Sequence, residues 1–124
     1  MNTCITQEFI KFARGHFRLD WDGIHGAPHW SRVRYNALLL ADHYDVDRVV
    51  LQWFAFTHDL DRKDDNEDPG HGARAAELVA FINDKYMGLS IEQLALLQTA
   101  CRGHSDGGLI SDRTVMVCWD ADRL

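Results

Sequence analysis

Hydrophobic positions along the chain recur at intervals of three and four residues, the spacing that places side chains on one face of an α-helix. Clusters of glycine, proline and acidic residues interrupt this pattern, and no useful length of sequence alternates as a half-buried strand would. The pattern therefore predicts an all-α fold, a compact bundle of about six helices in a single domain, residues 1–124. The expected helices cover residues 4–14, 28–44, 47–60, 70–87, 90–104 and 112–124.

Local signals support these boundaries. Pro28 suits the first turn of a helix. Ser90 and Gln93 have the spacing of a capping box, in which each side chain bonds the other residue's backbone N–H. Residues 47–60 are apolar almost all round, which indicates a buried central helix. The acidic run DRKDDNEDPG that follows predicts a charged loop over residues 61–70.

Polar side chains occupy the apolar stripes of five different helices. Each alone is typical of a hydrogen-bonded core histidine or a helix cap. Five together are harder to explain, because burying an unpartnered polar or charged group costs several kcal/mol. One cation inside the bundle would satisfy all of them, and helical bundles often build metal sites this way. The five residues are His29, His58, His71, His104 and Asp120.

His58 and Asp59 form the most distinctive pair. Adjacent helical residues point about 100° apart, so the two side chains cannot stand side by side on one face. From the last turn of a helix they can nevertheless reach one ion. The two carboxylate oxygens of Asp59 could also bridge to a second ion.

With these residues in view, the chain resembles the HD superfamily of metal-dependent phosphohydrolases. The resemblance rests on HGAPHWSRV, FTHDL, DPGHGARAAE, CRGHS and CWDAD, in the order H…HD…D, from about residue 22 to the end. It implies four metal ligands, with His71 and His104 in suitable order to hold a second ion. The four expected ligands are His29, His58, Asp59 and Asp120.

Imidazoles mixed with carboxylates, without thiolates, favour one or two Mn, Fe, Co, Ni or Zn ions over Ca or Mg. The resemblance implies that a metal-activated water hydrolyses a small, nucleotide-like phosphoester, as a phosphomonoesterase or a phosphodiesterase. Asp59 and His25 are the catalytic candidates, with His25 as the acid for the leaving group. Arg32 and Arg62, each three residues after an expected ligand, are candidates for substrate binding.

Two other functions fit the same residues. One is a di-iron oxygenase of the myo-inositol oxygenase type, whose site uses six ligands in the order H…HD…H…H…D. The other is a regulatory module that binds a metal or a nucleotide without turnover.

Composition narrows the class of protein. The formal net charge of −6 argues against a nucleic-acid polymer as partner. Three scattered cysteines without CxxC spacing favour a reducing compartment, so we expect a cytoplasmic protein. No apolar run is long enough to span a membrane. The helical pattern continues to Leu124 without a C-cap signal. This is compatible with a short domain or with one that continues. The sequence leaves the oligomeric state open.

Overall fold

The computed structural model describes residues 3–106 and 112–124, and within these the fold is all helical. The expectation of a small all-α bundle is confirmed. Six α-helices and one π-helical segment are present among the described residues. In chain order they are α1 (Gln7–His16), α2 (Ala27–Ala41), α3 (Arg48–Thr57), α4 (His71–Ile82), η1 (Asn83–Met87), α5 (Ile91–Asp106) and α6 (Arg113–Arg123).

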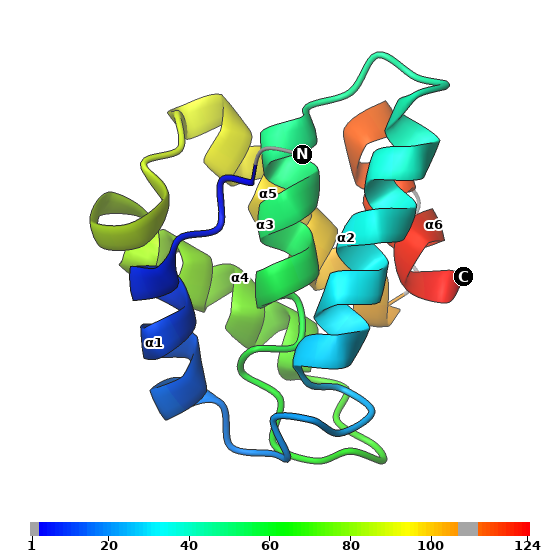
Figure 1. Cartoon of the computed structure of the whole chain (residues 1–124). Coiled ribbons are helices and arrows are strands. Elements are labelled where there is room, and N and C mark those ends of the chain that lie inside the picture. Colours follow the sequence, from blue (N-terminus) through cyan, green and yellow to red (C-terminus); the bar gives the residue numbers. More distant parts are fainter. Residues whose placement is uncertain (1–2, 107–111) are drawn as a thin grey trace.

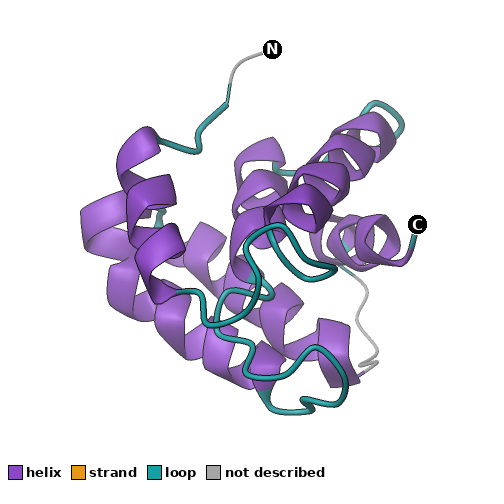
Figure 2. Cartoon of the chain, turned by 60° about the horizontal axis from the view of Figure 1, so that its bottom comes forward, coloured by secondary structure: helices purple, strands orange, loops and turns teal. Residues whose placement is uncertain are grey.

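Helix α3 lies inside the bundle (Figure 1), with α2 and α5 among its neighbours and α6 next to both. Its side chains are buried on nearly every face, as the apolar sequence of residues 47–60 predicts. Trp53 and Phe54 of this helix are fully enclosed. Two long loops, residues 17–26 and 58–70, meet at one end of the bundle (Figures 1 and 2).

Side-chain caps define several helix starts. Asp47 accepts hydrogen bonds from the backbone N–H groups of Val49 and Val50 at the start of α3. The capping box before α5 is confirmed, because Ser90 and Gln93 exchange hydrogen bonds of 3.1 Å. Pro28 stands in the first turn of α2.

Three expected helices end earlier than the sequence pattern suggests. The helix expected over residues 28–44 ends at Ala41. α3 stops at Thr57, and tight turns follow, with Leu60 N–H bonded to Thr57 O and Arg62 N–H bonded to Asp59 O. The HD pair therefore lies in the turn that ends this helix.

The helix expected over residues 70–87 changes to π-helix at Asn83. The Asn83 side chain exchanges two hydrogen bonds with the backbone of Leu89. Gly88 ends the segment with φ of 64°, a conformation that glycine adopts without strain.

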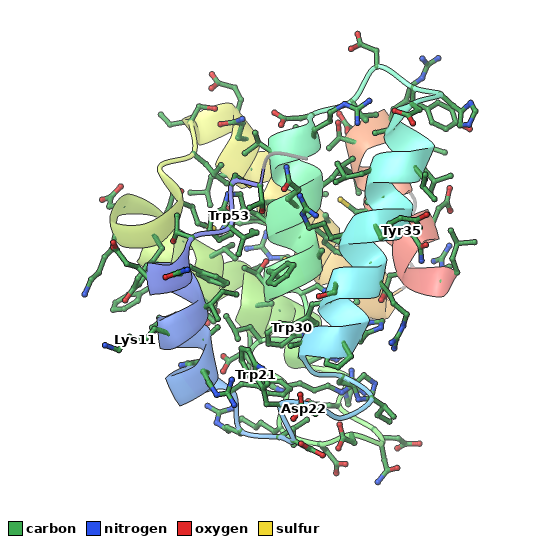
Figure 3. The ribbon with its side chains drawn as sticks, in the orientation of Figure 1. Lys11, Trp21, Asp22, Trp30, Tyr35 and Trp53 are labelled. Carbon is green, nitrogen blue, oxygen red and sulfur yellow. The ribbon has the colours of Figure 1, made fainter. Side chains whose placement is uncertain are left out.

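Aromatic rings pack the end of the bundle where the two loops meet. Trp30 in the first turn of α2 is fully buried, with its ring centroid 5.3 Å from that of Trp21 in the preceding loop (Figure 3). The Trp30 indole also donates a 2.8 Å hydrogen bond to the carbonyl of His25. These contacts fix the loop that precedes α2. Within the described residues, no helix has the length and apolar character needed to cross a membrane.

Candidate metal centre

Six side chains that could bind a metal come together from five helices and their flanking turns; five of them line a pocket of about 310 Å³, and His58 is fully buried next to them. Most come from helix ends: the first turns of α2 and α4, the turn after α3, the last turn of α6. The histidine from α5 lies in the last turn of that helix, two residues before it ends. The six are His29, His58, Asp59, His71, His104 and Asp122. Ile24, His25 and Arg62 complete the lining.

Backbone carbonyl groups orient three of the four imidazoles. His58 Nδ1 lies 3.0 Å from both Phe54 O and Ala55 O. His104 Nδ1 lies 2.6 Å from Cys101 O, and His71 Nδ1 contacts Asp68 O. A carbonyl oxygen can only accept, so each Nδ1 carries the proton. In the neutral form of each ring, Nε2 then keeps a lone pair, the form in which imidazole binds a metal.

The Nε2 atoms lie close together in two pairs. His71 Nε2 lies 2.9 Å from His104 Nε2, and His29 Nε2 lies 3.3 Å from His58 Nε2. His71 and His104 both present acceptor nitrogens, which repel each other unless a proton or a cation lies between them. That pair therefore requires positive charge at its centre.

The two oxygens of Asp59 divide the six side chains into two half-sites. Oδ2 lies 3.6 Å from His29 Nε2 and 3.3 Å from His58 Nε2. Oδ1 lies 3.4 Å from His71 Nε2 and 3.9 Å from His104 Nε2. We call His29, His58, Asp59 and Asp122 the first half-site, and His71, His104 and Asp59 the second half-site.

Asp122, and not the expected Asp120, joins the first half-site. Asp122 Oδ1 lies 3.1 Å from His29 Nε2 and 3.2 Å from His58 Nε2. Asp120 is exposed, so its assignment as a ligand was wrong.

The error came from the choice of helix face. Asp120 follows Met116 at helical spacing, and an apolar residue at position 116 suggests a core-facing stripe, but Met116 is 44% exposed and marks the outer face of α6. The inner face carries Val115 and Cys118, both fully buried, and Asp122 continues that stripe at the same spacing.

Charges in the pocket shift the protonation of its members in opposite directions. Burial lowers the pKa of His58, but the carboxylates of Asp59 and Asp122 outweigh it and hold that pKa well above its ordinary value. Burial raises the pKa of Asp59, but His58 and His104 outweigh it and bring that pKa well below its usual range. The pKa of Asp122 is lowered too, because hydrogen bonds with His29 and His58 outweigh its burial. Burial lowers the pKa of His71, and the nearby His104 and Arg62 add to this.

The predicted arginines lie in different places. Arg62 is buried beside the pocket, and Nη1 lies 3.1 Å from His71 Nε2 and 3.5 Å from Asp59 Oδ1. Its Nε and Nη2 donate to the carbonyls of Asp64 and Asn66, so much of its donor capacity holds the loop. Arg32 is exposed on α2 and does not line the pocket, so its expected place in the site was wrong.

Two histidines outside the six candidate ligands have side-chain partners. His25 lines the pocket, and its Nδ1 lies 2.9 Å from Asp65 Oδ1. His16, which shows no pattern in the sequence, pairs with Asp61 at 3.0 Å and ties α1 to the loop after the HD pair. No sequence signal links either pair, because the partners are about 40 residues apart and lie in loops or at a helix end.

The donor set fits a divalent metal by its chemistry and its spacing. Two atoms bound at about 2.0–2.2 Å to one ion lie roughly 3–3.5 Å apart. Most nitrogen–oxygen distances within the half-sites fall in or near that range, from 3.1 to 3.6 Å. A comparison of the chain with protein-family models, curated proteins and solved structures found no significant match.

Proposed function

We propose that this protein is a metal-dependent phosphohydrolase with two divalent transition-metal ions, of the kind that the HD superfamily represents. One observation carries the proposal: four imidazole Nε2 atoms converge, and Asp59 offers one oxygen to each pair of them. The acceptor nitrogens of His71 and His104 repel each other unless a proton or a cation lies between them. Two cations, one at each half-site and both sharing Asp59, would supply positive charge to the whole cluster.

Ions bound there would lower the pKa of a coordinated water and neutralise charge on the phosphoryl oxygens of a substrate. The protein's own residues then orient the substrate and exclude competing ligands. Arg62 is the one guanidinium group among the residues that line the pocket, next to Asp59 and the second half-site. Its fixed position favours a phosphate oxygen placed between the ions and Nη1.

The pocket favours a small substrate. A volume of about 310 Å³ is at the lower end for ligand sites. Glu67 lines an adjoining pocket with His71, where Asp68 is paired with Arg74. Glu67 and the net charge of −6 disfavour a long polyanion, whereas one phosphoester group with a compact leaving group fits. We therefore propose a small phosphoester as substrate and no nucleic-acid polymer.

Metal analysis with a matched pair of α6 variants tests the proposal. Protein loaded with Mn²⁺, Fe²⁺, Co²⁺, Ni²⁺ or Zn²⁺ should bind two ions per chain and hydrolyse p-nitrophenyl phosphate or bis(p-nitrophenyl) phosphate. Asp122→Asn should weaken metal binding at least about tenfold, because a direct ligand matters no less than the groups that orient ligands. Asp120→Asn removes the same charge two residues away and should bind metal as the wild type does.

Other outcomes would contradict the proposal. Equal metal affinity in the two variants would remove Asp122 from the site. Tight metal binding without turnover of any ester would favour a regulatory module. Oxygen uptake by the anaerobically prepared ferrous protein, without ester hydrolysis, would favour an oxygenase.

A further inference from the structure

A second histidine–carboxylate pair borders the pocket outside the two half-sites. His25 lines the pocket from the loop before α2, and Asp65 reaches it from the loop after α3. The His25 side chain is 21% exposed, so it is reached by solvent and by a ligand in the pocket. Neither residue belongs to the converging Nε2 cluster.

The structure holds His25 in one orientation. Its backbone carbonyl accepts the 2.8 Å hydrogen bond from the buried Trp30 indole. Its ring stands edge-on to His29, with the planes at 84° and the centroids 6.3 Å apart. The loop turn is tight, because a Cβ on Gly26 would lie 2.1 Å from the Trp21 carbonyl oxygen. Only glycine fits there, so the backbone path beside His25 is fixed by sequence.

Arg62 holds the loop segment that carries Asp65 next to the His25 ring. The guanidinium group donates 2.8 Å to the carbonyl of Asp64 and 3.1 Å to the carbonyl of Asn66, the residues on either side of Asp65. Arg62 is itself buried and lies 3.5 Å from Asp59. One side chain therefore connects the HD pair with the loop that carries the Asp65 carboxylate.

We propose that His25 donates a proton to the leaving group during ester hydrolysis and that Asp65 is its positioning residue. The Asp65 carboxylate accepts a hydrogen bond from Nδ1–H of His25. Nε2 is therefore the ring nitrogen left to contact a substrate in the pocket. This inference rests on the proposed hydrolase function and adds an acid to it.

The step is balanced in atoms and charge. The oxygen of a water molecule forms a bond to phosphorus while the bond from phosphorus to the ester oxygen breaks. The electron pair of the broken bond goes to the ester oxygen, which takes the Nε2 proton of the His25 imidazolium. The attacking water loses one proton to solvent, and His25 regains one from solvent.

Leaving-group dependence tests the acid. Nitrophenolate leaves without protonation, whereas an alkoxide needs a proton as the bond breaks. His25→Gln should lower kcat for an alkyl phosphate about 10²- to 10⁴-fold, the range of general acid catalysis. Its kcat for p-nitrophenyl phosphate should change less than about threefold. Asp65→Asn should show the same selectivity at smaller size, and Asp22→Asn, the same loss of charge at an exposed position of the loop before α2, should show none.

A readout without turnover tests the pairing itself. In chelated protein labelled with ¹⁵N-histidine, the Nδ1 signal of His25 should report a hydrogen-bonded N–H, and Asp65→Asn should shift it. Metal content should stay unchanged in His25→Gln and in Asp65→Asn.

The outcomes separate the two proposals. Equal losses for alkyl and nitrophenyl esters in His25→Gln, or an unshifted His25 signal in Asp65→Asn, would overturn this inference and leave the hydrolase in place. A metal-loaded wild type that hydrolyses neither ester overturns both.

Discussion

At the scale of single residues, His58 shows how a proton and a metal ion compete for one place. Its Nε2 lies between Asp59 Oδ2 at 3.3 Å and Asp122 Oδ1 at 3.2 Å. In metal-free protein a proton on Nε2 is stabilised there by both carboxylates, which outweigh burial and raise the pKa of His58. A metal ion must displace this proton before it can bind.

Metal affinity should therefore fall as the pH is lowered. At pH values below the raised pKa of His58, a metal ion must displace a proton from this ring. The metal affinity therefore falls about tenfold for each pH unit and each proton displaced. Asp59 and Asp122 have lowered pKa values, so they stay ionised over this range and add no proton to the exchange. Competition titrations with Zn²⁺ against a chelator from pH 6 to 8, corrected for the chelator's own protonation, measure the slope. An affinity independent of pH would show that no proton occupies Nε2.

Sequence reasoning named five of the six residues of the two half-sites: four histidines, because each lies on an apolar stripe whose helix could be identified, and Asp59, as the neighbour of His58 in the HD pair. It missed Asp122 because the sequence WDAD offers two aspartates on opposite faces of one short helix. The hydropathy pattern places Met116 in the core and so favours Asp120, but Met116 is exposed in the structure. The partners of His25 and Arg62 could not be predicted, since loop contacts leave no periodic signal.

At the scale of helices, α5 and α6 approach each other closely at Gly103. A Cβ added to Gly103 would lie 2.1 Å from Cζ2 of Trp119. The Trp119 ring is buried, and its Nε1 donates a 2.9 Å hydrogen bond to Ala100 O. The ring cannot rotate away without losing that bond, so any larger residue at position 103 must move α6.

Gly103→Ala should lower the free energy of unfolding by about 1–3 kcal/mol, the usual cost of overpacking. It should also weaken metal binding, because α6 carries Asp122 as well as Trp119. Urea denaturation and metal titration measure both effects.

Gly15→Ala is the matched control for this substitution. No atom lies within 4 Å of a Cβ at position 15, so alanine should be neutral or stabilise α1 by about 0.5–1 kcal/mol. Unchanged stability and metal affinity in Gly103→Ala would show that the two helices can separate without cost.

The helices themselves were largely predictable, because hydrophobic spacing and caps act locally. The ends of α3 and α4 were not. Both depend on side chains that bond across a turn, such as Asn83 with Leu89 and Arg62 with the loop carbonyls. The hydrophobic periodicity of the sequence continues through such positions although the α-helix ends there.

At the scale of the whole molecule, the pocket joins distant parts of the chain. His29 and Asp122 are 93 residues apart in sequence and lie 3.1 Å apart in the fold. A ligand held by both restrains α2 and α6 together, and it binds the folded state in preference to the unfolded chain. Metal binding should therefore contribute to stability.

Chelation should lower the melting temperature of metal-loaded protein. An ion at one hundred times its Kd adds about 2.7 kcal/mol, which corresponds to roughly 5–20 °C for a domain of this size. Calorimetry with and without EDTA measures the shift. In Asp59→Ala, which lacks the carboxylate common to both half-sites, EDTA should have no effect. An equal shift in wild type and variant would place the stabilising ion elsewhere.

Because Asp59 belongs to both half-sites, the occupancy of one cannot be independent of the other. The first half-site has a second carboxylate and the second half-site has none, so the two differ in charge as well as in number of donors. An ion in the first half-site, which has more donors, would fix the orientation of the Asp59 carboxylate. The other oxygen of Asp59 would then remain aimed at His71 and His104. The asymmetry thus implies an order of filling, in which a tightly held ion prepares the place for a more exchangeable one.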